Sequence, residues 1–398
     1  MRAEVPKRTT ARRPPDRKAR IVAAAAELFC ERGYHNVSVA DVAAAVDITA
    51  PALYRHFRGK PDLLLQVVTS SIDAIAEAVA TAPDLDTYLR TAVSRAIDRR
   101  GTAVLWQREA RHLPEDHRDQ LRRTLIGVRD GIGALILAER PELTTADAQL
   151  LAWSALSVLG SVSGHRATLP RRRFEPLLYG LVHAATRLPL ARTTAAAADP
   201  SPATGYTGLD LSRREEILHA AIRLFDERGF QSVSTDDIGE ASGASGPSIY
   251  KHFPSKTDLL VAAVVRAGEQ RRAATTLALA EATGPRESLD ALLRSYIAFA
   301  LRHSHLIGLL IAEIDQLPEK ERKASRQAQR DYLALWTRVL GEVRPGLERA
   351  EARIVLGATL TTVDNAVRTG GPGERADLAG RLQAIATTLL LTPAPAAL

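Results

Sequence analysis

Apolar residues recur along this chain at the spacing of amphipathic helices. Ile21, Ala24, Ala25, Leu28 and Phe29 follow the i, i+3, i+4, i+7 pattern that gathers side chains on one helical face. The sequence contains no alternating apolar and polar run long enough for a useful strand. The pattern therefore predicts an all-α protein. After each N-terminal segment, helices are expected at 62–80, 84–100, 102–112, 115–139, 143–166 and 171–188, and at 257–282, 286–303, 305–314, 319–342, 347–369 and 373–391.

The whole pattern repeats after 196 residues. The stretch from Arg20 to Leu64 aligns without gaps with the stretch from Glu216 to Leu260. Weaker similarity continues beyond it, because REARHLPEDHRDQLRR resembles AEIDQLPEKERKASRQ farther along the chain. We expect a duplicated and fused unit, whose two copies are joined by a flexible segment rich in Ala, Thr, Pro and Gly.

Two short helices follow the first long helix of each copy. Gly33 and Gly229 are expected to end the long helices. A tight turn then separates the short helices, with Asp47 or Gly243 suited to its left-handed position. A helix, a short turn and a second helix form the helix-turn-helix arrangement, whose second helix enters the DNA major groove. The short helices are expected at 39–46 and 49–57, and at 235–242 and 245–253.

The second short helix of each copy carries a polar face. Leu53 and Phe57, with their repeat equivalents, are expected to pack inward, and Thr49 and Ser245 are expected to cap the helix. Hydroxyl, imidazole and cationic groups on the opposite face can reach phosphates or base edges. That face carries Thr49, Ala50, Tyr54, Arg55 and His56 in one copy and Ser245, Gly246, Tyr250, Lys251 and His252 in the other. Lys60 and Lys256 begin the next helix and are expected to touch a phosphate.

Charge adds a third feature. The 398 residues have a formal net charge of +7, and the first 20 residues hold eight basic and two acidic side chains. Such an arm can follow phosphates or enter a minor groove, through Arg12, Arg13 and Arg17 here. A disordered solubilising tail is the alternative.

A single cysteine, Cys30, excludes an intramolecular disulfide, and no signal peptide or apolar span is apparent, so we expect a cytoplasmic protein without a membrane partner.

At these residues the chain resembles the TetR family of bacterial one-component regulators. The resemblance covers 17–65 and 213–261 and rests on F-x-E-R-G-[YF], the S-x-x-D start of the next helix, and [LI]-Y-x-H-F followed by Lys three residues on. It implies that Ser38, Ser234 and Ser248 also contact DNA. The family often has Lys where Ala50 and Gly246 stand, and the two copies differ on the reading face, so we expect asymmetric half-sites about one helical turn or slightly more apart.

The resemblance also implies a function and an architecture. Members bind a double-stranded DNA operator and dimerise through their last two helices, so the fused copies are expected to form an intramolecular pseudo-dimer that could also self-associate. Similarity to actinobacterial regulators of lipid and steroid metabolism, including those of mammalian-cell-entry operons, implies a repressor released by a hydrophobic effector such as an acyl-CoA or steroid-derived thioester. The expected divisions are a basic arm (1–16), DNA-binding domain (17–65), regulatory domain (66–188), linker (189–210), second DNA-binding domain (211–261) and second regulatory domain (262–392).

Effector pockets in helical bundles form between facing helices. Glu109 and Glu313 occupy equivalent repeat positions inside apolar stretches, which favours them as pocket residues. Ordinary core packing, or a salt bridge to a neighbouring arginine, is the alternative. The complete set of candidates is Trp106, Glu109, Arg129 and Trp153 in the first copy, and Phe299, Glu313, Tyr332 and Trp336 in the second.

Motifs for catalysis are lacking. The sequence has no nucleophile elbow, phosphate-binding loop or dinucleotide fingerprint, and its histidines lack further ligands at zinc spacing. We therefore expect no catalytic residue, metal or cofactor, and an enzyme is the least favoured function. A helical interaction scaffold with degenerate DNA-binding heads remains the main alternative to a regulator.

Overall fold

The computed structural model describes residues 17–100, 105, 109, 113–165, 167, 169–190, 212–368 and 377–393. These residues form helices and connecting turns, without a strand, which confirms the all-α prediction. The first half contains α1 (Arg17–Arg32), η1 (Tyr34–Asn36), α2 (Val39–Ala45), α3 (Ala50–Tyr54), α4 (Lys60–Thr81), α5 (Leu85–Asp98), α7 (Glu115–Glu139), α8 (Thr145–Ser161) and α9 (Arg171–Arg187). The second contains α10 (Arg213–Arg228), α11 (Thr235–Ser242), α12 (Gly246–His252), α13 (Lys256–Ala280), α14 (Pro285–Arg302), α15 (Ser304–Ala312), η3 (Ile314–Gln316), α16 (Glu319–Val343), α17 (Arg349–Arg368) and α18 (Leu378–Leu391).

Most helices begin and end within a few residues of their expected bounds. The expected helix at 102–112 lies mostly outside the described residues. Helix α8 is shorter than expected, because the backbone N–H groups of Ser163 and Gly164 bond to carbonyls three residues back and close a turn. The helix therefore ends at Ser161 instead of residue 166.

We call α1–α3 the first head and α10–α12 the second head. In each head the first helix ends at a glycine with φ of 80°, Gly33 or Gly229. The turn before the last short helix uses a left-handed residue, Asp47 with φ of 55° or Gly243 with φ of 64°. Both heads therefore have the predicted helix-turn-helix backbone, including its left-handed turn position.

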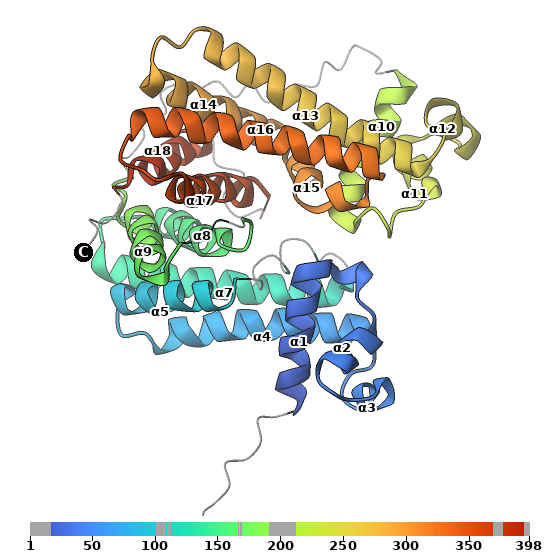
Figure 1. Cartoon of the computed structure of the whole chain (residues 1–398), viewed down its shortest axis with the longest axis horizontal. Coiled ribbons are helices and arrows are strands. Elements are labelled where there is room, and N and C mark those ends of the chain that lie inside the picture. Colours follow the sequence, from blue (N-terminus) through green and yellow to red (C-terminus); the bar gives the residue numbers. More distant parts are fainter. Residues whose placement is uncertain are drawn as a thin grey trace, which may run out of the picture.

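Long helices connect each head to the bundle behind it (Figure 1). Helix α4 extends from the first head and packs against α1, α5 and α7, and α13 packs in the same way against α10, α14 and α16, and also against α15. By length and composition alone, α4 is apolar enough to cross a membrane. Its buried residues, including Leu63, Leu64 and Val67, instead pack inside the bundle. In the second bundle, α14 and α15 meet at 97°, with His303 at the bend.

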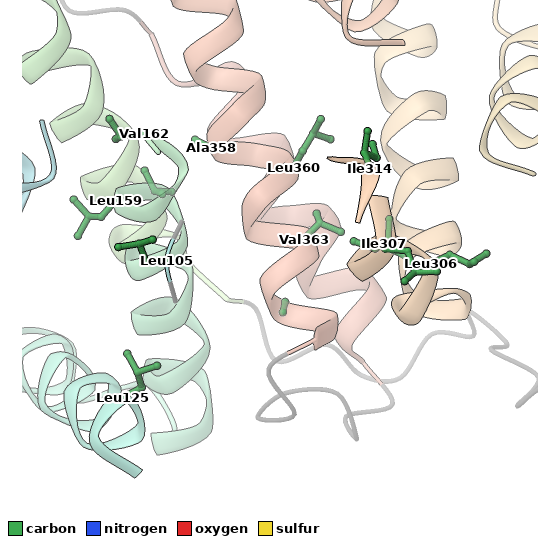
Figure 2. Close-up of a cluster of buried hydrophobic side chains, with 14 of the residues drawn as sticks. Leu105, Leu125, Leu159, Val162, Leu306, Ile307, Ile314, Ala358, Leu360 and Val363 are labelled. Carbon is green, nitrogen blue, oxygen red and sulfur yellow. The ribbon is translucent and has the colours of Figure 1, made fainter. Parts of the chain in front are cut away.

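The two halves pack together through α8 and α9 of one and α17 and α18 of the other (Figure 1). Helices α8 and α17 make the largest part of this contact and are buried on several sides. Buried apolar side chains of both halves lie in the region between them, among them Leu159 and Val162 from the first and Leu360 and Val363 from the second (Figure 2). Both heads lie at one end of the molecule, on the right of Figure 1, and the four helices shared by the halves lie on the left.

Two ion pairs, one buried and one partly buried, join the halves in the same way. Asp147 on α8 accepts a hydrogen bond of 2.6 Å from Arg381 on α18, and Glu351 on α17 accepts one of 2.8 Å from Arg173 on α9. The acids occupy equivalent places on α8 and α17, and the arginines lie in the first turn of α9 and of α18, at positions that differ by about one turn when the helix ends are aligned. Such reciprocal pairing is the mark of a two-fold interface, here formed within one chain.

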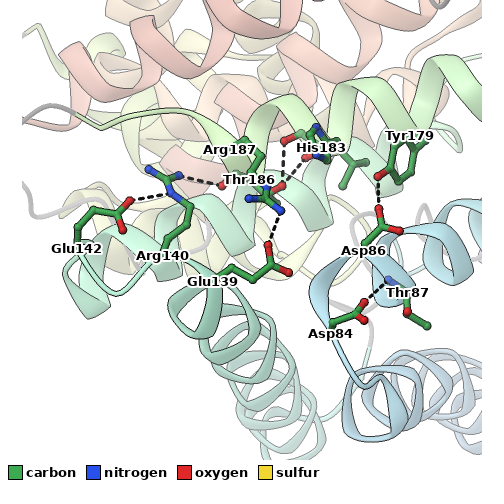
Figure 3. Close-up of polar contacts among 11 residues, drawn as sticks. Asp84, Asp86, Thr87, Glu139, Arg140, Glu142, Tyr179, His183, Thr186 and Arg187 are labelled. Carbon is green, nitrogen blue, oxygen red and sulfur yellow. Dashed lines mark hydrogen bonds and ion pairs between the residues drawn. The ribbon is translucent and has the colours of Figure 1, made fainter.

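A further repeated contact fixes the end of the last helix in each half. Arg140 donates hydrogen bonds to the carbonyl oxygens of Thr186 and Leu188 and pairs with Glu142 (Figure 3). Arg344 donates to the carbonyl of Leu390 in the second half, at 2.9 Å. These arginines neutralise exposed carbonyls at helix C-termini, where the helix dipole favours a cation.

Candidate nucleic-acid interface and its junction with the bundles

The predicted reading helices present their polar face to solvent. Tyr54 is 54% exposed and Tyr250 is 53% exposed, which is unusual for so large a side chain. Leu53 and Ile249 pack inward, as expected from the sequence. Among the other candidates, Ser38, Thr49, Arg55, His56, Ser234, Ser245, Lys251 and His252 are exposed, and Ala50, Gly246 and Ser248 are half-buried.

Serine caps fix the helix that precedes each reading helix. The Oγ of Ser38 accepts from the backbone N–H of Asp41, and the Asp41 carboxylate accepts from the backbone N–H of Ser38. Ser234 and Asp237 repeat this capping box. Hydrogen bonds from the serine lower the pKa of both aspartates. The side chains of Ser38 and Ser234 are thus already engaged, and Asp237, an acid near the second reading face, has a structural role.

The expected caps on the reading helices themselves are absent. Thr49 and Ser245 occupy the N-cap positions, but neither side chain makes a capping hydrogen bond. Proline in the first turn removes one of the two N–H groups that a cap can bond. The other N–H is taken by the backbone, since Ala52 and Ser248 bond to the carbonyls of Thr49 and Ser245 at 2.9 Å. Both hydroxyls consequently remain directed to solvent.

Lys60 and Lys256 lie against their own heads. The Nζ of Lys256 donates to the carbonyls of Phe230 and Val233 at 2.9 and 2.8 Å and lies 4.4 Å from the centre of the Phe230 ring. The Nζ of Lys60 donates to the carbonyl of His35 at 3.3 Å and lies 4.3 Å from the centre of the Tyr34 ring. Burial lowers the pKa of both ammonium groups. These partners within the protein account for the positions of both lysine side chains without a phosphate contact.

Glu109 and Glu313 lie at the junction between bundle and head. Glu313, which is 1% exposed, accepts a hydrogen bond of 2.9 Å from the backbone N–H of Phe230. Glu109 accepts one of 3.4 Å from the N–H of Tyr34. Each carboxylate also raises the pKa of the nearby lysine, Lys60 or Lys256, against the effect of burial. The two glutamates, predicted to line a pocket, therefore connect the bundle to the first residue after each glycine turn.

The other candidates of the second bundle form a filled aromatic cluster. Tyr296, Tyr332 and Trp336 have ring centres 6.2 to 6.4 Å apart, and Trp336 is fully buried. Tyr296 donates a hydrogen bond of 2.6 Å to Asp364, whose pKa is raised to about 6 by burial. Arg271 lies 4.2 Å from the centre of the Tyr332 ring. Phe299 is buried nearby, against His303.

The first bundle differs in its polar core. Arg129 pairs with Asp130 at 2.6 Å, and Trp106 lies outside the described residues. The Trp153 indole nitrogen and the Tyr88 hydroxyl are buried and have no hydrogen-bond partner among the residues that the structure describes. Burial raises the pKa of Tyr88. The second bundle has such atoms too, because the Trp336 indole nitrogen and the Nε of Arg368 are buried without a partner in the described part of the chain.

The N-terminal side of each head carries further cations. Arg17 is exposed at the start of α1, whereas Arg12 and Arg13 lie outside the described residues. Lys18 lies 5.7 Å from the centre of the Phe57 ring, and its repeat equivalent Arg214 lies 4.6 Å from that of Phe253. The α1 and α10 cations thus border the reading helices.

Comparisons with known proteins find sequence relatives at both heads. The family model described as bacterial regulatory proteins, tetR family, matches residues 21–67 and 217–263. An HTH-type transcriptional repressor, KstR2 of Rhodococcus jostii, is 32% identical over 166 residues, which cover 39% of this chain and 78% of that protein. An HTH-type transcriptional activator, FasR of Mycolicibacterium smegmatis, is 29% identical over 155 residues, covering 39% and 70%. A ketosteroid regulator structure from Mycobacterium tuberculosis, KstR2, aligns with a TM-score of 0.41 and 22% identity over 46% of this chain and 95% of that one.

Proposed function

Because this chain belongs to the TetR family of bacterial regulatory proteins and carries the family's DNA-binding domain twice, we propose that it is a single-chain transcriptional regulator whose two heads bind one operator. The relatives named above are transcriptional regulators, which agrees with the prediction that this protein is not an enzyme. The observation that carries the proposal is the pair of exposed reading helices, with Tyr54 and Tyr250 projecting to solvent at equivalent positions. Footprinting of the purified chain on the DNA upstream of its own gene tests it directly.

In this proposal the two halves act as a pseudo-dimer. The reciprocal pairs Asp147–Arg381 and Glu351–Arg173 support it, because they set the halves face to face as a two-fold dimer would. The heads differ at the reading face, for example Arg55 against Lys251 and Ala52 against Ser248. The operator is therefore proposed to have unlike half-sites about one helical turn apart, centre to centre.

We propose that the protein represses transcription in the cytoplasm and that a hydrophobic effector relieves this repression. The Rhodococcus relative is named a repressor, and its identity to this chain is higher than that of the relative named an activator. Either bundle could hold the effector, because Tyr88 and Trp153 in the first and Trp336 in the second each have a buried polar atom without a described partner. A reporter under the chain's own upstream region checks the sign: deletion of the gene should raise expression.

Release from DNA is proposed to pass through the junction glutamates. A bundle that changes shape around an effector would move Glu313, and the buried hydrogen bond to Phe230 would carry that movement to the second head. Glu109 and Tyr34 would do the same for the first head. Packed helices have discrete arrangements, so a small displacement can change the separation of the heads.

Salt dependence gives a first test of the DNA contacts. Two heads and the basic arm should together contact about 6–10 phosphates, so affinity for the operator should fall by about 10³–10⁵-fold between 50 and 200 mM salt. Fluorescence anisotropy with a labelled operator at several salt concentrations measures the slope. An affinity that changes less than about threefold over this range would contradict phosphate-anchored binding.

The junction can be tested without knowing the effector. Glu313→Ala removes the carboxylate that holds the Phe230 N–H, leaving a buried donor unpaired at a cost of about 1–3 kcal/mol. We expect the second head to lose its fixed orientation. Spin labels at Arg58→Cys and Pro254→Cys, in a Cys30→Ser background, report the distance between heads by pulsed electron resonance, and Glu313→Ala should broaden that distribution.

Glu269→Ala serves as the matched control, because this exposed acid lies on α13 outside the junction. Its distance distribution should equal that of the parent. If Glu313→Ala also left the distribution unchanged, the glutamate would be a packing feature without a part in positioning the head.

A further inference from the structure

A basic groove lies at the rear of the second head. It opens between α10, the end of α11, α13 and the bend between α14 and α15, and has a volume of about 650 Å³. Buried Ala220, Ile222 and Leu306 give it apolar walls. Arg266, one of its lining residues, lies ten residues after Lys256 on α13. It is therefore about 15 Å from the end of that helix nearest the second head. The basic residues that line it are Arg223, Arg266, Arg302, His219, His303 and His305.

Arginines outnumber carboxylates among the residues that line this groove. Glu216 is the one carboxylate there, against three arginines. Arg223 and Arg266 form ion pairs with Glu227 and Glu215, and His305 pairs with Asp226, so acids beside the groove already partner these three side chains. Within the part of the chain that the structure describes, Arg302 and His219 make neither a hydrogen bond nor an ion pair.

Arg302 and His219 line the groove beside a further histidine. Burial, and then the nearby Arg302 guanidinium and His219 ring, lower the pKa of His303, which stands at the bend between α14 and α15. A phosphate placed among these three groups would offset that electrostatic cost, because an opposite charge favours a protonated ring. The cluster formed by Arg302, His219 and His303 is therefore suited to an anionic ligand.

We propose that this groove binds a phosphorylated small molecule, with its phosphate groups against Arg302, His219 and His303. Guanidinium and imidazole groups donate charge-assisted hydrogen bonds to phosphate oxygens, and arginine matches phosphate geometry with two parallel donors. Ala220, Ile222 and Leu306 would contact the less polar part of the same molecule. The groove volume lies in the range of small-molecule sites and accommodates a ligand of nucleotide size.

The first half lacks several of the basic residues that line this groove in the second half. At the repeat positions of His219, Arg223 and Arg266, the first half has Ala23, Glu27 and Ser70. The ligand would therefore bind asymmetrically, one molecule per chain. It would bridge α10 of the head to α14 and α15 of the bundle and so hold the second head in one orientation. Its effect on DNA binding rests on the proposed function, whereas its binding does not.

Calorimetric titration of the full chain with sodium pyrophosphate, without DNA, tests the site. We expect pyrophosphate to bind the parent chain and to bind the double variant Arg302→Gln, His219→Gln at least tenfold more weakly. Both side chains are exposed, so circular dichroism should show unchanged helix content. Arg338→Gln, which removes an exposed arginine on α16 outside the groove, should leave the affinity unchanged.

The remaining outcomes separate the alternatives. Citrate should bind at least tenfold more weakly than pyrophosphate, and equal affinity would overturn the preference for phosphate. If pyrophosphate did not bind the parent chain, the proposed site would be wrong. Equal affinity in the parent and the double variant would also overturn it, because the anion would then bind elsewhere, on the heads or the arm. Operator binding is measured separately, so a chain that binds pyrophosphate in the groove and no operator refutes only the proposed function.

Discussion

Replacing Tyr54 and Tyr250 together by alanine will lower affinity for the operator by about 10³-fold. Each phenol is more than half exposed in the free protein, so its removal costs the head little packing. On DNA each can contribute about 2 kcal/mol through contacts with base edges or phosphates, and 1.4 kcal/mol corresponds to a tenfold change. The two heads act on one operator, so the losses add. Anisotropy titration with the footprinted DNA, at fixed salt, measures the change.

A matched control removes an exposed apolar side chain elsewhere. Leu277→Ala truncates a residue that is 72% exposed on α13, far along the helix from the second head. Its affinity for DNA should equal that of the parent. Each single tyrosine variant should lose about thirtyfold. Unchanged DNA affinity in the double variant would support the rival interpretation of a helical scaffold with degenerate heads.

The second large effect is expected at the contact between halves. Arg381→Leu should lower the free energy of unfolding by about 3–5 kcal/mol, because it leaves the Asp147 carboxylate buried without this cation. The two side chains are 9% and 10% exposed, so water cannot replace the lost partner. Urea denaturation followed by circular dichroism measures the change.

The repeat provides the control for this variant. Arg173→Leu removes the arginine of the other pair; Glu351 is 8% exposed, but Arg173 is 33% exposed, its second partner Glu348 is 58% exposed, and Glu351 keeps a hydrogen bond from the Glu348 N–H. Solvent screening should limit its cost to about 1–2 kcal/mol. Arg381→Met with Asp147→Leu replaces both buried partners by apolar groups and should recover most of the stability. If Arg381→Leu alone cost less than about 1 kcal/mol, the pair would not stabilise the contact.

The sequence pattern predicted the helices and heads because local signals specify them. Gly33, Gly229 and Gly243 mark positive φ angles, and the S-x-x-D capping boxes mark helix starts, so each feature is encoded within a few neighbouring residues. The reading-face residues followed from helical period alone. The exposure of Tyr54 and Tyr250 agrees with it.

Contacts between residues far apart in the sequence could not be predicted from the local pattern. Lys60 and Lys256 begin helices beside a DNA-reading segment, yet their ammonium groups bond to carbonyls 25 and 23 to 26 residues away. Thr49 and Ser245 stand where a cap is expected, and the following proline and a backbone bond remove the need for one. Sequence spacing places a side chain on a helix without identifying what it meets across the fold.

The contacts between halves were also missed, although the sequence held a signal. Asp147 and Glu351 stand near the starts of equivalent apolar helices, and Arg173 and Arg381 near the starts of the helices that follow. An acid kept at matching repeat positions of two apolar helices, with an arginine in the first turn of each following helix, indicates a reciprocal contact. Comparing the two copies for buried charge, beyond the heads, would have identified it.

The reciprocal packing of the two halves within one polypeptide has a consequence for dosage. A regulator assembled from separate subunits must first associate, so its occupancy of DNA rises with about the square of subunit concentration when subunits are scarce. Here the partner of α8 and α9 is α17 and α18 of the same molecule, present at a fixed ratio of one to one. Operator occupancy should then follow the first power of protein concentration, which keeps control effective when a cell holds only a few copies.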